Sequence, residues 1–202
     1  MSIPRMDRYL TAMNGNSRKA MTLYRLNLRL SQVLFTIVSC FEVALRNRID
    51  QHYSAKLGPD WLRDASLRGG MFNTMHCEKT PHIIAEVIRK LNPYCHSKLV
   101  SELDFGFWRY TFARHQYNHT YIFSELEKIN LLRNRLAHHE PVCFLPGKPI
   151  KDTSFSRQRY EIILRLFQWM QINETALLYG IDRVNELSNS IDTQLLLPPR
   201  RA

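Results

Sequence analysis

An arginine, an amide and a histidine stand close together within the segment 131–141, at Arg133, Asn134 and His138. A guanidinium can bind a phosphate through two parallel hydrogen bonds, and an imidazole can move a proton near neutral pH. An amide can orient the imidazole or the phosphate through its own hydrogen bonds. These residue types are suited to phosphoryl transfer on RNA without a metal ion, because RNA carries its own nucleophile, the 2′-hydroxyl.

The spacing places two of these side chains on one face of a helix. Asn134 and His138 are four residues apart, so one helical turn separates them. Arg133 has a long side chain that can reach the same space, although its Cα points elsewhere. His138 lies near the expected helix end, where the dipole favours a protonated imidazole. We expect His138 to transfer protons, Arg133 to stabilise charge on the phosphate, and Asn134 to orient His138 or the phosphate.

A structural interpretation of the motif stays open at this point. Arg133, Asn134 and His138 can instead cap the helix and line an interface, which is what most polar helix ends do. His139 follows directly, and we expect it to support the pocket or contact the helix end.

No metal site is expected. His138, His139 and Glu140 make a poor metal-binding set because adjacent helical residues point apart. His115 and His119 are four apart, but no carboxylate or cysteine at ligand spacing accompanies them, so we expect an ordinary pair at the surface or core edge. The sequence contains no glycine-rich phosphate loop and no serine nucleophile elbow, and we expect no cofactor.

The elements that must position these residues show helical periodicity and no strand pattern. A first helix is expected from Ser17 to about residue 57, because apolar residues recur every three or four positions and Gly58-Pro59 stops it. At about 60 Å it is long enough to kink or divide. Its predicted core residues are Leu23, Leu26, Leu30, Leu34, Ile37, Phe41, Leu45 and Ile49.

Shorter helices are expected in the rest of the chain. Thr80-Pro81 is a typical helix start, and Asn92-Pro93 ends that helix. Residues 105–108 are expected to turn the chain, and residues 141–149, with three prolines and one glycine, to form a loop. Further helices are expected over about 97–103, 120–137, 156–179 and 182–189, followed by a flexible tail over 190–202. The expected core residues are Ile84, Val87, Ile88 and Leu91 in the helix that starts at Thr80-Pro81, Ile122, Leu126, Ile129 and Leu132 or Leu136 in the helix over 120–137, and Ile162, Leu166, Trp169 and Met170 in the helix over 156–179.

Aromatic residues gather between positions 107 and 121. Core packing is the first interpretation of this zone, and stacking on unpaired bases is the second. Its members are Phe107, Trp108, Tyr110, Phe112, Tyr117 and Tyr121.

The charge favours a polyanionic partner. The 202 residues carry a net charge of +10, with a pI of about 9.7. Lys and Arg displace counterions from phosphates, although a basic surface can also serve solubility alone. The charge gains weight here because Arg133 and Arg135 lie within the segment 131–141, and a second basic cluster, 46–48, lies near the end of the first expected helix.

Length and cysteine usage point to one cytoplasmic domain. A chain of 202 residues favours a single domain over 1–202. The start of the chain has no apolar signal-peptide core, and no apolar run is expected to reach bilayer length, so we expect no membrane contact. Dispersed cysteines, without any Cys-x-x-Cys pair, indicate reduced thiols at Cys40, Cys77, Cys95 and Cys143.

Three segments resemble one known family. Arg133-Asn134 followed by His138 resembles the Arg-polar-x-x-x-His signature of HEPN-type ribonuclease domains, and residues 133–141 resemble its Abi-like (abortive infection) branch. The segment 41–49, with Gly58, Trp61 and Leu62 after it, looks like the N-terminal signature of Abi-like proteins. Residues 105–108 are similar to the aromatic mid-segment of that family. Together the segments cover roughly residues 17–178.

The resemblance implies an all-α, HEPN-like helical bundle with a long N-terminal helix and additional short helices. It implies a homodimer whose two motifs build one composite site, and a metal-independent endoribonuclease in phage defence or toxin-type growth arrest, with an antitoxin or phage-derived trigger as a further partner. Glu42, Arg46 and Asn47 are expected to support the motif helix or line its pocket. Glu42 and Arg46 also have the spacing of an ordinary intrahelical ion pair.

Two other functions compete with catalysis. A non-catalytic RNA-binding or sensor module would keep the basic fold without needing His138. A structural or assembly protein would use the basic face on protein partners and would show no salt-dependent RNA binding.

Overall fold

The computed structural model describes residues 3–73, 79–114 and 119–193. This part of the chain is all-helical, at 73% helix and without a strand, so the all-α prediction with a long N-terminal helix is confirmed. The helices in order are α1 (Ile3–Ala12), α2 (Ser17–Leu57), α3 (Trp61–Ser66), α4 (Lys79–Lys90), α5 (His96–Glu102), α6 (Phe105–Arg114), α7 (His119–Ala137), α8 (Ser154–Trp169), α9 (Glu174–Leu177) and α10 (Val184–Thr193).

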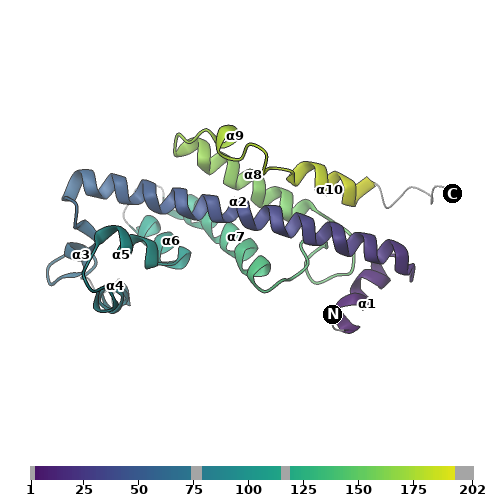
Figure 1. The fold of residues 1–202 in the computed structure, drawn as a ribbon, viewed down its shortest axis with the longest axis horizontal. Coiled ribbons are helices and arrows are strands. Elements are labelled where there is room, and N and C mark those ends of the chain that lie inside the picture. Colours follow the sequence, from purple (N-terminus) through teal and green to yellow (C-terminus); the bar gives the residue numbers. More distant parts are fainter. Residues whose placement is uncertain (1–2, 74–78, 115–118, 194–202) are drawn as a thin grey trace. The chain divides into compact units, whose positions relative to one another are not determined.

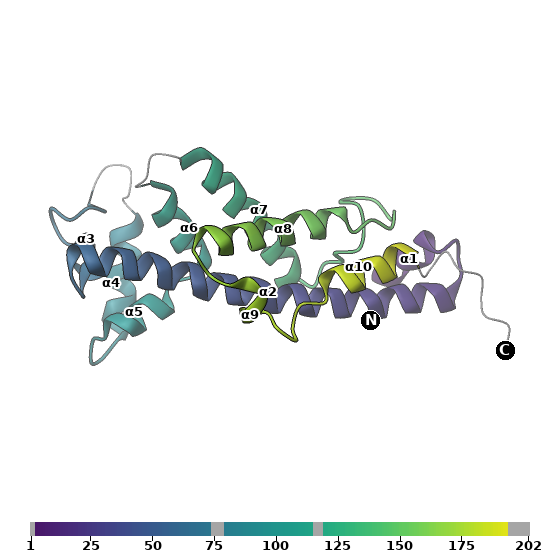
Figure 2. The same cartoon turned by 90° about the horizontal axis from the view of Figure 1, so that it is seen from above.

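The chain divides into two compact units. Unit 1 contains Met1–Phe41 and Lys128–Ala202, and unit 2 contains Glu42–Glu127. The helices α2 and α7 each begin in one unit and end in the other. Within unit 1, α8 and α10 lie beside the purple N-terminal half of α2 in both views (Figures 1 and 2). The expectation of a single domain stays a prediction.

The apolar stripe predicted for α2 is the face of this helix that packs into the core. Removing one leucine side chain from water stabilises the fold by about 1.5–3 kcal/mol, so a continuous stripe holds the helix firmly. Leu26 is half-buried. The other predicted positions are all buried, namely Leu23, Leu30, Leu34, Ile37, Phe41, Leu45 and Ile49.

The composition of α2 corrects one expectation. An 18-residue window of this helix has a mean hydropathy of 1.6 and at most two charged residues, so by length and composition it could cross a membrane. We expected no apolar run of that length, and this was wrong. The core helix of a globular protein passes the same test, and α2 buries one face, with 33% of the window buried. A single helix of this kind is weak evidence for a membrane.

The loop after α7 is anchored in the core of unit 1. Val142, Cys143 and Phe144 are fully buried. The side-chain carbonyl of Asn27 on α2 accepts a hydrogen bond from the Val142 backbone N–H at 2.9 Å. The hydroxyl of Ser156 on α8 donates to the Val142 carbonyl at 2.7 Å. Both backbone polar groups of the buried Val142 are therefore satisfied, and the loop is tied to two helices.

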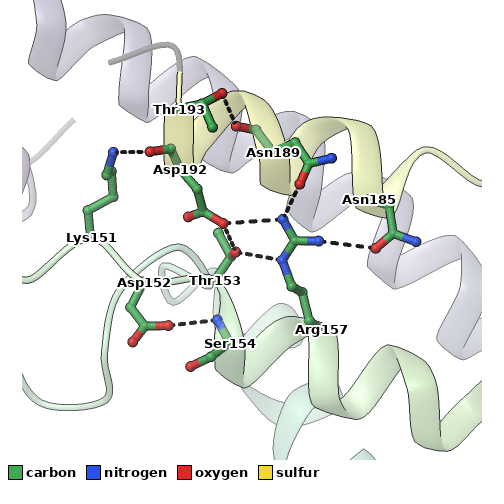
Figure 3. A network of polar contacts seen from close by, with 9 residues as sticks. All are labelled: Lys151, Asp152, Thr153, Ser154, Arg157, Asn185, Asn189, Asp192 and Thr193. Carbon is green, nitrogen blue, oxygen red and sulfur yellow. Dashed lines mark hydrogen bonds and ion pairs between the residues drawn. The ribbon is translucent and has the colours of Figure 1, made fainter. Parts of the chain in front are cut away.

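A polar clamp joins α8 to α10 (Figure 3). The guanidinium of Arg157 donates to Asn185, Asn189 and Asp192 of α10, at 3.2, 2.8 and 3.2 Å. It also donates to the hydroxyl of Thr153 at 3.1 Å, and that hydroxyl donates to the Asp192 carboxylate at 2.7 Å. We call these five residues the Arg157 clamp.

Local polar contacts explain where the helices differ from the prediction. The segment 105–108 begins α6 and does not form a turn, because the Asp104 carboxylate accepts from the Phe107 backbone N–H at 2.7 Å and caps the new helix. Phe107 and Trp108 are buried there, as expected of a core. The short helices α1 and α3 were not expected.

The C-terminal boundaries also differ from expectation. The helix expected over 156–179 ends at Trp169, because α8 stops there and α9 is a separate turn. Trp169 is consequently 54% exposed, and its predicted core position was wrong. Met170 is half-buried. Helix α10 extends to Thr193, so the first four residues of the expected flexible tail are helical.

Candidate active site at the end of α7

The end of α7 is fixed by its backbone. Ile129, Leu132 and Leu136 are buried and hold the helix against the core. His139 has a φ of 53°, in the left-handed region that commonly ends helices. Its N–H bonds to the Leu136 carbonyl at 3.0 Å, and the Glu140 N–H bonds to the Arg135 carbonyl at 2.8 Å. This paired pattern is a Schellman motif, so His138 has a defined position in the last turn.

Asn134 and His138 lie on the outer face of α7. The His138 N–H bonds to the Asn134 carbonyl at 2.9 Å, which confirms that one helical turn separates them. The His138 side chain is exposed, Asn134 is half-buried, and Leu131, three residues before Asn134, is 51% exposed. This face of α7 therefore presents an exposed leucine beside an amide and an imidazole, so it can make both apolar and polar contacts.

Arg133 lies on another flank of the helix. Five residues at about 100° each place its Cα–Cβ direction about 140° around the axis from that of His138. Its side chain is half-buried and takes part in interactions of the folded chain. The backbone of one chain therefore directs the guanidinium and the imidazole to different sides of α7.

Arg135 supports the structure of the helix end. It donates to the Pro141 carbonyl at 2.7 Å, and its guanidinium carbon lies 4.6 Å from the ring centroid of Phe155 on α8. Glu140 is 3.4 Å from its Nε. Burial lowers the pKa of Arg135, and the nearby carboxylate of Glu140 raises it. These contacts fix the guanidinium over the loop, and the expectation that Arg135 supports the site or binds RNA stays a prediction.

The neighbouring thiol is unsuited to be a nucleophile. Cys143 is fully buried, and burial raises the pKa of its thiol to about 12. A thiolate is the reactive form of cysteine, and very little of it exists near pH 7 at this pKa. Cys143 is therefore not a candidate nucleophile at this end of unit 1.

The other predicted support residues belong to unit 2. Glu42 and Arg46 are half-buried, and Asn47 is exposed. The Arg46 guanidinium donates to the Ser101 backbone carbonyl at 3.4 Å, which links α2 to the end of α5. The three residues do not belong to the unit that contains the α7 motif. Their role beside the motif stays a prediction.

Among the residues that the structure describes, no group of three or more His, Cys, Asp or Glu side chains could hold a metal ion. His115 lies outside the described residues, as do Tyr117 and Cys77, and nothing describes the side chains of His119, Tyr110 and Phe112. Tyr121 is 50% exposed, unlike the buried Phe107 and Trp108 of the same aromatic zone.

The sequence interpretation missed an exposed row of arginines. Arg18, Arg25 and Arg29 all lie on the solvent side of α2 in unit 1. Their spacing of seven and four residues is the available signal, because it keeps the three side chains on one face of a helix.

The chain matches no family model, no curated protein and no solved structure. The resemblance of residues 41–62, 105–108 and 131–141 to the HEPN group therefore stays a prediction.

Proposed function

We propose that the chain is a metal-independent endoribonuclease with a HEPN-like bundle, of the Abi-like type. The supporting observation is the outer face of α7, where Asn134 and the exposed imidazole of His138 stand one turn apart beside the exposed Leu131. The net charge of +10 suits an RNA substrate. The family resemblance adds a cytoplasmic role in abortive infection, with an antitoxin or a phage-derived trigger.

The proposal includes a homodimer formed through the outer face of α7. One chain directs Arg133 and His138 to different sides of the helix, so a single motif makes a poor site. A two-fold pairing of this face brings two copies of His138 to one interface, and supplies one imidazole for each proton transfer. Leu131, at 51% exposure, provides the apolar contact at such an interface.

The reaction at this site uses the RNA 2′-hydroxyl as nucleophile. One imidazole takes the hydroxyl proton while the 2′ oxygen forms a bond to phosphorus. The bond from phosphorus to the 5′ oxygen breaks, and the second imidazolium donates a proton to that oxygen. Arg133 reaches this space from its flank of the helix through its long side chain and stabilises the charge on the phosphate oxygens, and Asn134 orients an imidazole. The products are a 2′,3′-cyclic phosphate and a 5′-hydroxyl.

The decisive experiment is RNA cleavage in excess EDTA, with the product ends mapped. Wild-type protein is expected to cleave labelled transfer or messenger RNA, and His138→Ala to cleave it at least 100-fold more slowly, because general acid–base catalysis contributes about 10²–10⁴-fold. His82→Ala is the matched control, since it removes an exposed histidine of α4 in unit 2. Equal cleavage by wild type and His138→Ala would contradict the proposal, and binding without cleavage by either would favour the RNA-binding module.

The dimer can be tested separately at Leu131. Leu131→Arg places a charge on the outer face of α7, and the exposed position lets the monomer fold unchanged. We expect sedimentation to show a monomer and cleavage to be lost. Leu177→Arg on α9, where the leucine is 43% exposed, is the control and should leave both unchanged. If Leu131→Arg stays dimeric and active, the dimer interface does not lie on the outer face of α7.

A further inference from the structure

The exposed side of α2 in unit 1 carries a straight row of positive charge. Arg18, Arg25 and Arg29 are exposed, and their spacing keeps all three within about 40° around the helix axis. They span about 17 Å along the axis at 1.5 Å per residue. We call these three residues the α2 arginine row.

The row lacks acidic neighbours along its own helix. The sequence from residue 17 to residue 41 has four basic residues and no Asp or Glu. Within the described part of the chain, the guanidinium groups of Arg18, Arg25 and Arg29 make no hydrogen bond or ion pair. Other arginines of unit 1 are held by protein acceptors, namely Arg8, Arg135, Arg157 and Arg183. The arginine row is therefore a set of charges available to a partner.

Apolar side chains stand on the adjoining face of the same helix. Leu28 and Phe35 are each 49% exposed, and the exposed Gln32 lies between them and the arginine row. An exposed phenylalanine beside arginines suits a chain that offers both phosphates and unpaired bases, because any base can stack on an aromatic ring. In a duplex the bases are already stacked on one another and cannot use the ring in this way.

We propose that the α2 arginine row and Phe35 bind single-stranded RNA. The guanidiniums bind consecutive phosphates, and Phe35 stacks on a base. At about 3.4 Å per stacked nucleotide, the row matches about five nucleotides of one strand. A lipid surface is less suited to this face, because the larger apolar stripe of α2 is buried in the core, and in the unit 1 part of the helix only Leu28 and Phe35 are large apolar side chains left exposed for insertion. The inference extends the proposed function, from which it takes its choice of RNA as partner.

The test measures binding to an RNA that cannot be cleaved. The probe is a fluorescein-labelled oligouridine of about 12 nucleotides with 2′-O-methyl groups, titrated with full-length protein between about 50 and 200 mM KCl. The variant Arg18→Gln/Arg25→Gln/Arg29→Gln is expected to bind at least tenfold more weakly. Its slope of log affinity against log salt should be shallower by about 2, at about 0.7 for each lost phosphate contact. Phe35→Ala should weaken binding about fivefold or more and leave the slope unchanged.

A matched control removes the same charge elsewhere. Arg68→Gln/Arg89→Gln/Lys90→Gln changes three exposed basic residues of unit 2, and should bind the probe like wild type. Equal weakening by the two triple variants overturns the inference, because net charge alone would then explain binding. Tighter binding to a duplex of the same length, or to vesicles containing phosphatidylserine, also overturns it, as does a wild-type protein that does not bind the probe.

The inference and the proposed function fail in different ways. If the triple variant loses binding and wild-type protein does not cleave unmodified RNA, the arginine row stands and the ribonuclease proposal falls. If wild-type protein cleaves RNA through His138 while the triple variant binds the probe as wild type does, the ribonuclease proposal stands and the arginine row falls.

Discussion

Two polar regions border the loop between α7 and α8, and they use their polar groups differently. The guanidinium of Arg157, at one end, donates to four acceptors from the same chain (Figure 3). At the other end, backbone bonds fix the last turn of α7, while the exposed imidazole of His138 makes no hydrogen bond or ion pair with any described residue. The chain satisfies the first region itself and leaves the second available to another molecule.

Arginines of unit 1 show the same division. Arg135 and Arg157 are part-buried and bound to carbonyl, carboxylate or amide oxygens of the chain, so they hold loops and helices together. Arg25 and Arg29 are exposed and have no such acceptors in the described part of the chain. Charge alone therefore says little about function, whereas the presence or absence of an internal partner separates structural arginines from available ones.

The largest effect on stability is expected at the clamp. Arg157→Ala removes all four hydrogen bonds and leaves the carboxylate of Asp192 without its guanidinium, which should lower the free energy of unfolding by about 2–3 kcal/mol. Urea unfolding followed by circular dichroism measures this loss. Arg157→Lys keeps the charge but loses the planar fork, so its loss should be smaller but clear. Equal stability of Arg157→Ala and wild type would mean that the clamp does not hold α10.

A loss of about 1–3 kcal/mol is expected when the loop after α7 is released. Asn27→Ala leaves the buried N–H of Val142 without its acceptor, and the fold then carries the desolvation cost of that group. Urea unfolding again gives the value. Gln32→Ala, an exposed change on the same helix, serves as the control and should be neutral. A neutral Asn27→Ala would show that water satisfies Val142.

Much of the fold follows from the sequence, because the apolar spacing of α2 is long and regular. Ser17 begins the helix and Leu57 ends it before Gly58, as the periodicity and the stop signal predicted. The predicted helix boundaries were wrong where local contacts, and not the apolar spacing, determine where a helix begins or ends. Asp104 caps α6 through a contact that spacing does not reveal, and the end of α8 at Trp169 has no glycine or proline to mark it.

The candidate site was predicted in part, for reasons of geometry. A four-residue step fixes the relation of Asn134 to His138, so the sequence is enough to place them on one face. The anchoring of Arg135 over Phe155 depends on how α8 packs beside the loop, which no local pattern contains. The Arg157 clamp likewise joins residues 28 to 35 positions apart. Contacts between residues so far apart in the sequence can be identified only from the folded structure.

A smaller, pH-dependent effect is expected from the buried thiol. Burial raises the pKa of Cys143 to about 12, while the unfolded thiol keeps its ordinary value near 9.0. Above pH 9 the unfolded chain therefore loses the proton first, and stability falls as pH rises from about 9 toward 12. We expect a loss of about 1 kcal/mol between about pH 8 and 10 by urea unfolding. Cys143→Ala should show a smaller loss over the same interval, and an equal loss would assign the effect to other groups.

Among these variants, His138→Ala is expected to change stability least and RNA cleavage most. His138→Ala removes an exposed side chain whose internal bonds are those of its backbone, so the free energy of unfolding should change by less than about 0.5 kcal/mol. Urea unfolding of His138→Ala beside Arg157→Ala tests the contrast directly. Replacing a residue that supports the fold should lower both the stability and the activity of the protein. Replacing a residue that serves chemistry should lower activity alone, so a destabilised His138→Ala would show that this imidazole has a structural role like that of the clamp.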